Sequence, residues 1–252
     1  MLLAIDIGNT DGVFALHDGK QWHERHRIPS KRDTPAAIYK EKLRDFLQEK
    51  AQEVSHIMMG CVVPQLAEPV SQAVHELMPQ ARFERMGLEL YPQLPLTIPS
   101  PHEIGEDIVA NVLAAHHQFQ QACIVIDFGT ALTFVACSDD GTIEGVAIAP
   151  GLKTSIKAIF LQAAQLPEVP LEVPSTALGK NTIHALQSGI LLGYESLVSG
   201  MIDRIEREMG KRCSIIATGG LSSVLTPLKH RFDVTDPLLT LKGLKLASEL
   251  RS

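Results

Sequence analysis

Short apolar runs alternate along the chain with segments in which apolar residues recur at helical spacing. The runs predict buried strands, and the helical spacing predicts amphipathic helices. The expected strands are 2–7, 12–16, 56–63, 81–86, 122–127, 132–137, 143–148, 214–217 and 232–235. The expected helices are 35–47, 66–77, an alanine-rich segment ending near 119, 152–165, 182–209, 221–229 and 238–250. Strands that alternate with helices indicate an α/β fold.

Turn and cap residues refine these boundaries. Asp18-Gly19 predicts a hairpin turn, and the stretch of basic residues after it is expected to be irregular. Thr34 is expected to cap the first helix, with Pro35 at its first position. Four prolines between Gly87 and Pro101 predict a long loop, and loops of this length are often functional.

The first strand and the fifth share a pattern that predicts an internal duplication. Strand 2–7 leads into Asp6-Ile7-Gly8-Asn9-Thr10, and strand 122–127 leads into Asp127-Phe128-Gly129-Thr130. Each is followed by a second apolar run, so a hairpin is expected after each aspartate and the sheets are expected to be mixed. A chain of 252 residues suits two domains of about 120 residues each. The boundary is expected near Gln120.

Composition limits the classes of protein that fit. Hydrophobic residues make up 45% and charged residues 21%, which is typical of a folded globular protein. The net charge is −6 and no Lys/Arg block stands out, so no nucleic-acid partner is expected. The four cysteines lack CxxC spacing and are expected to be buried, reduced thiols of a cytoplasmic protein. Asp6 interrupts any N-terminal signal, and no apolar run is long enough to span a membrane.

The stretch after the first strand has the residues of a phosphate site. An aspartate at the carboxyl end of a strand, here Asp6, can hold Mg²⁺ directly or through water. Gly8 lets the backbone approach a phosphate, and Thr10 can add a hydroxyl donor. An ordinary hairpin with an Asx turn also explains this stretch when it is taken alone. Its repetition around Asp127 favours a nucleotide held between the two copies.

A third element follows strand 214–217. Thr218-Gly219-Gly220 forms a turn with two glycines that can lie flat against a nucleotide, on its adenosine side. A plain turn at the start of a helix explains it equally well.

These three elements, in this order, resemble the acetate and sugar kinase/actin superfamily. The whole chain is similar to one family within it, the type III pantothenate kinases. The stretches that carry the resemblance run in family order from end to end: 6–10, 62–64, 103–107, 127–131, 150–151, 164–167, 179–182, 187–190, 217–220 and 236–244. The resemblance implies two duplicated ribonuclease H-like domains, 1–120 and 121–252, with mixed five-stranded sheets flanked by helices.

The resemblance also implies an activity, which is ATP-dependent phosphorylation of pantothenate to 4'-phosphopantothenate, the first step of coenzyme A biosynthesis. Mg²⁺ and a monovalent cation, K⁺ or NH₄⁺, are the implied cofactors, and the implied assembly is a homodimer. The phosphate-binding residues carried over are Asp6, Ile7, Gly8, Asn9, Thr10, Asp11, Gly12 and Val13. Nucleotide contacts are expected from Thr130, Gly219 and Gly220, and the monovalent cation at Asp127. The acceptor is expected at Gly105, Glu106, Asp107, Ile108 and Thr182, with Asp107 as general base.

Two features of the acceptor side leave alternatives open. Asp107 lies at a helix start, where a carboxylate complements the helix dipole as well as serving as a base. Ile108 stands where the family motif Gly-x-Asp-Arg has arginine, and isoleucine offers no donor to a carboxylate substrate. The alternative functions are a divergent paralogue with another acceptor, and a nucleotide-binding protein with weakened catalysis.

Glycines at 189, 193 and 200 interrupt the helix expected at 182–209. Each destabilises a helix by about 1 kcal/mol relative to alanine. Glycine at such positions is typical of close helix packing, and it fits the contact between two subunits that the resemblance implies.

Overall fold

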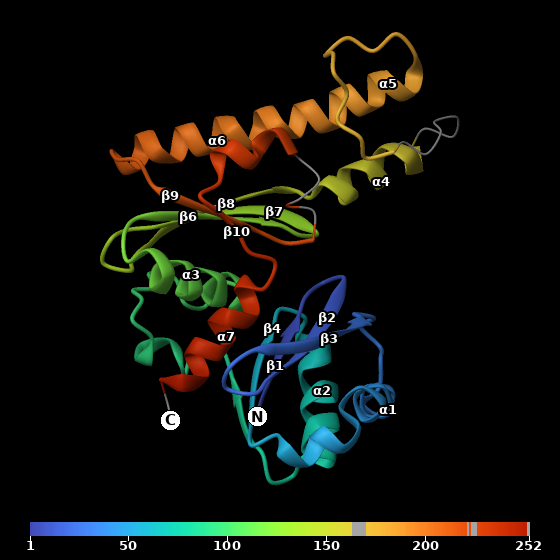
Figure 1. The fold of residues 1–252 in the computed structure, drawn as a ribbon, viewed down its shortest axis with the longest axis vertical. Helices are drawn as coiled ribbons and strands as arrows, with labels where there is room; N and C mark the ends of the chain where they lie inside the picture. Colours follow the sequence, from blue (N-terminus) through green and yellow to red (C-terminus); the bar gives the residue numbers. More distant parts are fainter. Residues whose placement is uncertain (163–169, 221, 223–225, 251–252) are drawn as a thin grey trace. The chain divides into compact units, whose positions relative to one another are not determined.

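The computed structural model describes residues 1–162, 170–220, 222 and 226–250. These residues form two compact units, one of Met1–Ala114 with the C-terminal residues from Leu238, and one of Ala115–Pro237. Figure 1 shows the chain coloured from the N-terminus in blue to the C-terminus in red. Each unit is built on one five-stranded mixed sheet.

The sheet of the first unit has the order β3-β2-β1-β4-β5. β1 pairs antiparallel with β2 and parallel with β4, while β2–β3 is antiparallel and β4–β5 is parallel. The strands are β1 Leu2–Ile7, β2 Asp11–His17, β3 Trp22–Pro29, β4 His56–Cys61 and β5 Arg82–Arg85. The helices of this unit are α1 Ala36–Leu47, α2 Pro64–Leu77, α3 Glu106–Phe119, which continues into the second unit, and α7 Leu239–Glu249.

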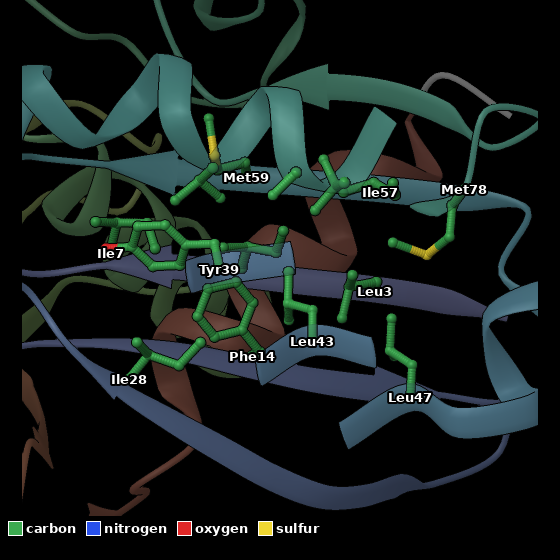
Figure 2. Packing of buried hydrophobic residues seen from close by; sticks show 14 of the residues in the cluster. Leu3, Ile7, Phe14, Ile28, Tyr39, Leu43, Leu47, Ile57, Met59 and Met78 are labelled. Atoms are coloured by element: carbon green, nitrogen blue, oxygen red, sulfur yellow. The ribbon is translucent and has the colours of Figure 1, made fainter. Parts of the chain in front are cut away.

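Alternation along the strands places two hydrophobic clusters on opposite faces of this sheet. Leu3, Ile57 and Met59 point to the face covered by α1 and α2, where they pack with Tyr39 and Leu43 (Figure 2). The other face contains the second cluster, in which Ala4, Ala15 and Met58 pack with apolar residues of α3 and α7. The sheet is therefore buried on both sides.

The sheet of the second unit repeats the first. Its order is β8-β7-β6-β9-β10, with antiparallel pairs on the β8 side and parallel pairs on the β10 side. The strands are β6 Cys123–Phe128, β7 Ala131–Cys137, β8 Ile143–Pro150, β9 Ser214–Thr218 and β10 Val234–Thr235. The helices are α4 Leu152–Gln162, α5 Thr182–Gln187 and α6 Gly193–Met209, and a π-helical turn, Ser188–Leu192, joins the last two. The expected duplication of a mixed α/β layer is confirmed.

The structure differs from the sequence expectations in local details. The stretch expected to be irregular contains β3, an outer strand whose Arg25 and Arg27 are exposed and so broke the apolar pattern. The cap residue of α1 is Pro35 and not Thr34, and no side chain caps this helix. Short 3-10 turns form at Gln48–Glu53, Tyr91–Gln93 and Thr226–Arg231.

Two expected features lie partly outside the described residues. The motif at 164–167 and the end of the helix expected at 152–165 fall in the range 163–169, so only α4 as far as Gln162 is described. Leu221 and most of the start of the helix expected at 221–229 are likewise outside the described residues.

The compact units also differ from the expected domains 1–120 and 121–252. The last helix, α7, belongs to the first unit because Leu241 and Leu244 are buried with the α3 residues of that unit. A Cβ on Gly243 would overlap the backbone of Ala110, so α7 lies directly against α3. Burial of an apolar helix face thus assigns α7 to the first unit, an assignment that the duplicated strand pattern does not contain.

Candidate active site

The first candidate element is the β1–β2 hairpin. Asp6 lies in β1 opposite Val13, one residue before the strand ends. The hairpin closes through a 3.1 Å hydrogen bond from the Gly8 N–H to the Asp11 carbonyl, which leaves Asn9 and Thr10 exposed at the tip. The Ser30 N–H donates to the Thr10 carbonyl at 2.9 Å and so ties the tip to the end of β3.

Close packing accounts for the glycine at position 12 of this hairpin. A Cβ there would lie 2.8 Å from the Ile7 Cδ1 atom and 3.2 Å from the ring of Phe14. The Arg27 guanidinium lies 3.8 Å from the Asp11 carboxylate and partly offsets its negative charge. Backbone N–H groups and one carboxylate thus gather at the carboxyl end of β1, as a phosphate–metal site requires.

The β6–β7 hairpin repeats this construction in the second unit. Asp127 lies opposite Thr133, one residue before β6 ends, and the Gly129 N–H donates to the Ala131 carbonyl at 3.1 Å. The Gly151 N–H donates to the Thr130 carbonyl at 3.1 Å, which is the counterpart of the Ser30–Thr10 bond. The two hairpins differ by one residue in loop length, since Ile7 pairs with Gly12 whereas Phe128 pairs with Leu132.

The turn after β9 packs directly on the second hairpin. Gly219 has φ +88°, a left-handed conformation that glycine adopts readily. A Cβ at this position would lie 2.5 Å from Asp127 Oδ1 and 2.7 Å from the Phe128 backbone nitrogen. By contrast, a Cβ on Gly220 would meet no described atom within 4 Å. The glycine turn therefore lies directly against Asp127 and Phe128, at the base of the hairpin that carries Thr130.

Four of the residues predicted to bind the acceptor, Gly105 to Ile108, lie at the start of α3 or directly before it, in the first unit. Asp107 Oδ1 accepts a 2.8 Å hydrogen bond from the Ile108 N–H. A Cβ on Gly105 would come 2.5 Å from the same carboxylate oxygen, so the glycine leaves room for the Asp107 side chain. Burial raises the pKa of the Asp107 carboxyl above its ordinary value, and the hydrogen bond from Ile108 opposes this shift.

The neighbouring Glu106 connects α3 to two strand ends. Its Oε2 atom accepts a 2.7 Å hydrogen bond from the Cys61 N–H at the end of β4. Its Oε1 atom accepts a 2.8 Å hydrogen bond from Nη2 of Arg85, the last residue of β5. Burial raises the pKa of Glu106, while Arg85 and the Cys61 N–H lower it. This carboxylate is therefore already engaged by the protein.

The β1–β2 hairpin and the residues Gly105 to Ile108 lie at the same end of the first unit's sheet. Asp6 pairs in register with Gly60 of β4, and a Cβ on Gly60 would lie 3.9 Å from the Glu106 Cβ. Burial, and then the charges of Glu106 and Asp107, raise the pKa of the Tyr91 hydroxyl to about 12. Ordinary parallel topology explains this gathering, since the carboxyl ends of parallel strands meet at one edge.

Sequence reasoning did not single out Arg85 or Tyr91, and it gave Cys61 no role in the site. The available signal was positional, because Cys61 lies in the expected strand 56–63 and Arg85 in the expected strand 81–86. Thr182, by contrast, was expected at the acceptor site; it is exposed at the start of α5 in the second unit. The side chain of Asn181 caps this helix by accepting a 2.9 Å hydrogen bond from the His184 N–H.

The carboxylates fit Mg²⁺ bound mainly through phosphate and water. Within the described ranges, no group of three or more His, Cys, Asp or Glu side chains could hold a metal ion. Mg²⁺ in phosphoryl-transfer sites is commonly held by one or two carboxylates with substrate phosphates, which suits Asp6 at the β1–β2 hairpin. Searched over the same ranges, no helix is long and apolar enough to cross a membrane.

A cavity of about 890 Å³ in the second unit lies away from these residues. It is lined by Ile215 near the start of β9, by the end of α6 and by charged side chains such as Arg212 and Arg231. The Asp127 hairpin adjoins the opposite end of β9, because Asp127 pairs with Thr218. The cavity includes none of the residues predicted for the site.

Comparison with known proteins agrees with the geometry. A solved structure described as a putative N-acetylglucosamine kinase from Porphyromonas gingivalis is 14% identical, with a TM-score of 0.53 and coverage of 97% of this chain and 98% of the other. A second, described as a conserved putative Baf family transcriptional activator from Campylobacter jejuni, is 21% identical, with a TM-score of 0.62 and coverage of 99% and 98%. Both likenesses are at the level of the fold, in which this chain has two five-stranded mixed sheets of equivalent order.

The comparisons of sequence identify a single family, whereas the solved structures show the fold. The family model for type III pantothenate kinase matches residues 2–204. A type III pantothenate kinase from Moorella thermoacetica is 35% identical over 252 residues and covers 99% of both chains. Another, from Gluconobacter oxydans, is 38% identical over 261 residues, with coverage of 99% of this chain and 93% of the relative. The chain belongs to the type III pantothenate kinase family.

Proposed function

We propose that this protein transfers the γ-phosphoryl group of ATP to the terminal hydroxyl of pantothenate, giving 4'-phosphopantothenate, the first step of coenzyme A biosynthesis. The observation that carries the proposal is the pair of equivalent hairpins, each with an aspartate and backbone N–H groups at a strand end, in a chain of this family. Phosphoryl transfer depends mainly on positioning and on neutralising charge, and the paired hairpins suit that task.

Asp107 is the proposed general base. Its carboxylate takes the proton of the attacking hydroxyl while that oxygen forms a bond to the γ-phosphorus and the bond to the β–γ bridging oxygen breaks, releasing ADP. Burial supports this role, because a carboxyl with a raised pKa is a stronger base once it is ionised. Gly105 supports it too, since a larger residue would displace the carboxylate.

The hairpins are the proposed phosphate and cation residues. Backbone groups from Asp6 to Val13 bind phosphate oxygens, and Thr130, Gly219 and Gly220 contact the nucleotide. Asp6 holds Mg²⁺, directly or through water, and Asp127 holds the monovalent cation, K⁺ or NH₄⁺. When bound, these cations neutralise charge that develops on the phosphates. Within the acceptor site, Gly105, Ile108 and Thr182 are the remaining proposed contacts.

A cytoplasmic homodimer is the proposed working form. A Cβ on Gly189, Gly193 or Gly200 would meet no described atom of the chain within 4 Å. These glycines therefore do not serve packing among the described residues, which supports a role for them against a second copy.

The deciding experiment is an ADP-release assay with Mg²⁺ and K⁺, run with and without pantothenate, with the product identified by mass spectrometry. Pantothenate-dependent ADP release and a product heavier by one phosphoryl group are expected. Tight ATP binding without such turnover would contradict the proposal and favour a divergent or weakened paralogue.

A further inference from the structure

Arg85 places a half-exposed guanidinium group beside Glu106, the first residue of α3 and the chain neighbour of Asp107. Its Nη2 atom donates to Glu106 Oε1 at 2.8 Å and to the Cys61 carbonyl at 3.3 Å, and its Nε atom lies 3.4 Å from Glu106 Oε2. Two nitrogens of the guanidinium thus face the two oxygens of one carboxylate. This side-on arrangement fixes the plane of the guanidinium, which a single contact would not.

In the ion pair between Arg85 and Glu106, the carboxylate is mostly buried and the guanidinium is exposed to solvent. The Glu106 side chain is 14% exposed, whereas the Arg85 side chain is 42% exposed. The Nη1 group of Arg85 makes no hydrogen bond with any of the described residues. Its two N–H donors are therefore available for a ligand, and a planar pair of donors suits the oxygens of a carboxylate or a phosphate.

Two nearby residues and the proposed acceptor itself indicate which ligand these donors meet. Asp107, the proposed base, follows Glu106 directly in the chain, so the guanidinium belongs to the acceptor side of the first unit. Ile108, the next residue, has no side-chain donor for an acid. The proposed acceptor is itself a carboxylate, and an acid that binds without a cation loses a charge-assisted hydrogen bond.

We infer that Arg85, held in orientation by Glu106, binds the carboxylate of the acceptor and makes the enzyme select an acidic acceptor over a neutral one. This role rests on the proposed function. Glu106 offsets the charge of Arg85 at long range, but at contact distance the two N–H donors dominate the interaction. The half-exposed position limits the effect, because solvent screens it.

The test compares pantothenate with pantothenyl alcohol, in which a CH₂OH group replaces the carboxylate. The ratio of kcat/KM for the acid to that for the alcohol is measured in the wild type, in Arg85→Met and in Arg82→Met. In Arg85→Met we expect this ratio to fall by about 10- to 100-fold, the range for a hydrogen bond to a charged group. Arg82 is the matched control, because it is an exposed arginine of β5 that pairs with Glu84 at 2.8 Å; its replacement should leave the ratio unchanged.

Other results would overturn the inference. Equal losses for the two acceptors would make Arg85 a structural partner of Glu106 alone. A higher KM for ATP at an unchanged ratio would assign the donors to a phosphate. Arg85→Lys keeps the positive charge but loses the planar pair of N–H donors, so it should give an intermediate ratio. This variant also keeps the inference testable if Arg85→Met does not fold.

Calorimetric binding of the two acceptors separates this inference from the proposed function, because it needs no turnover. Wild-type protein should bind the acid more tightly than the alcohol, and Arg85→Met should remove that difference. A wild type that phosphorylates neither compound contradicts the proposed function, while equal binding of acid and alcohol contradicts the role of Arg85.

Discussion

The hydroxyl of Thr154 donates a 2.7 Å hydrogen bond to the carbonyl oxygen of Thr130. Thr154 lies in the first turn of α4, and Thr130 is the tip of the second aspartate hairpin. The same carbonyl also accepts the Gly151 N–H, so the hairpin tip is held both by α4 and by the residue before it. In the first unit the equivalent carbonyl, that of Thr10, accepts the Ser30 N–H, and α1 starts only at Ala36.

Thr154→Val removes the side-chain hydrogen bond to the Thr130 carbonyl and leaves the bond from the Gly151 N–H. The net contribution of one hydrogen bond is about 0.5–1.5 kcal/mol, so the KM for ATP should rise about 2- to 10-fold with little change in the KM for pantothenate. Steady-state kinetics with each substrate varied in turn provides the measurement. Thr154→Ser keeps the hydroxyl and should resemble the wild type; equal kinetics in all three proteins would contradict the role of this bond.

Gly219→Ala should damage the nucleotide side far more than Gly220→Ala. At Gly219 the positive φ and the overlap with Asp127 and the Phe128 backbone together should destabilise the protein by at least about 2 kcal/mol. At Gly220 no described atom lies in the way. Thermal unfolding with and without ATP tests both, and a Gly219→Ala variant that keeps wild-type stability and ATP binding would refute the packing argument.

Asp107→Asn should lower kcat by about 10²- to 10⁴-fold, the usual contribution of a general base, with a smaller change in the KM for pantothenate. Because the base must be ionised, wild-type kcat/KM should rise with pH through a pKa above the ordinary aspartate value. The acidic limb of the pH–rate profile checks this. Full activity in the Asp107→Asn variant would remove Asp107 from the mechanism.

Asp107→Asn should also raise the free energy of unfolding at neutral pH. A carboxyl whose pKa is raised in the folded state favours the protonated form there, so its stabilising contribution is present at low pH and is lost as pH rises through the folded pKa. The amide introduced by Asp107→Asn stays neutral and avoids the desolvation of a charge. The difference in Tm between variant and wild type should be positive at pH 7 and shrink towards pH 3; a lower Tm at pH 7 would contradict it.

Local patterns predicted the parts of the fold that depend on neighbouring residues. The two hairpins follow from an apolar strand, an aspartate and a glycine turn, all within a few positions of Asp6 and of Asp127. β3 was not predicted because the exposed Arg25 and Arg27 of this outer strand interrupt the run of apolar residues that marks a buried strand. Its Ile28 is nevertheless buried.

The acceptor side depended on contacts that no local pattern contains. Glu106 is 21 residues from Arg85 and 45 from Cys61 along the chain, and only the meeting of strand ends brings them together. Likewise, α7 joins the first unit through contacts of Gly243 with Ala110, far earlier in the sequence. The motif around Asp107 could be recognised from sequence, but the partners of its neighbour could not.

The glycines of α6 offer a test of the proposed homodimer. In a lone chain, Gly200→Ala should stabilise the helix by up to about 1 kcal/mol, because no described atom lies within 4 Å of the added Cβ. If a second copy packs against this helix, a larger side chain should separate the subunits instead. Gly200→Leu should therefore shift sedimentation from dimer towards monomer while the far-ultraviolet circular dichroism is retained. Lys50, an exposed residue of the 3-10 turn Gln48–Glu53 in the first unit, supplies the control variant Lys50→Leu. A Gly200→Leu protein that sediments as the wild type does would exclude this face from the dimer contact.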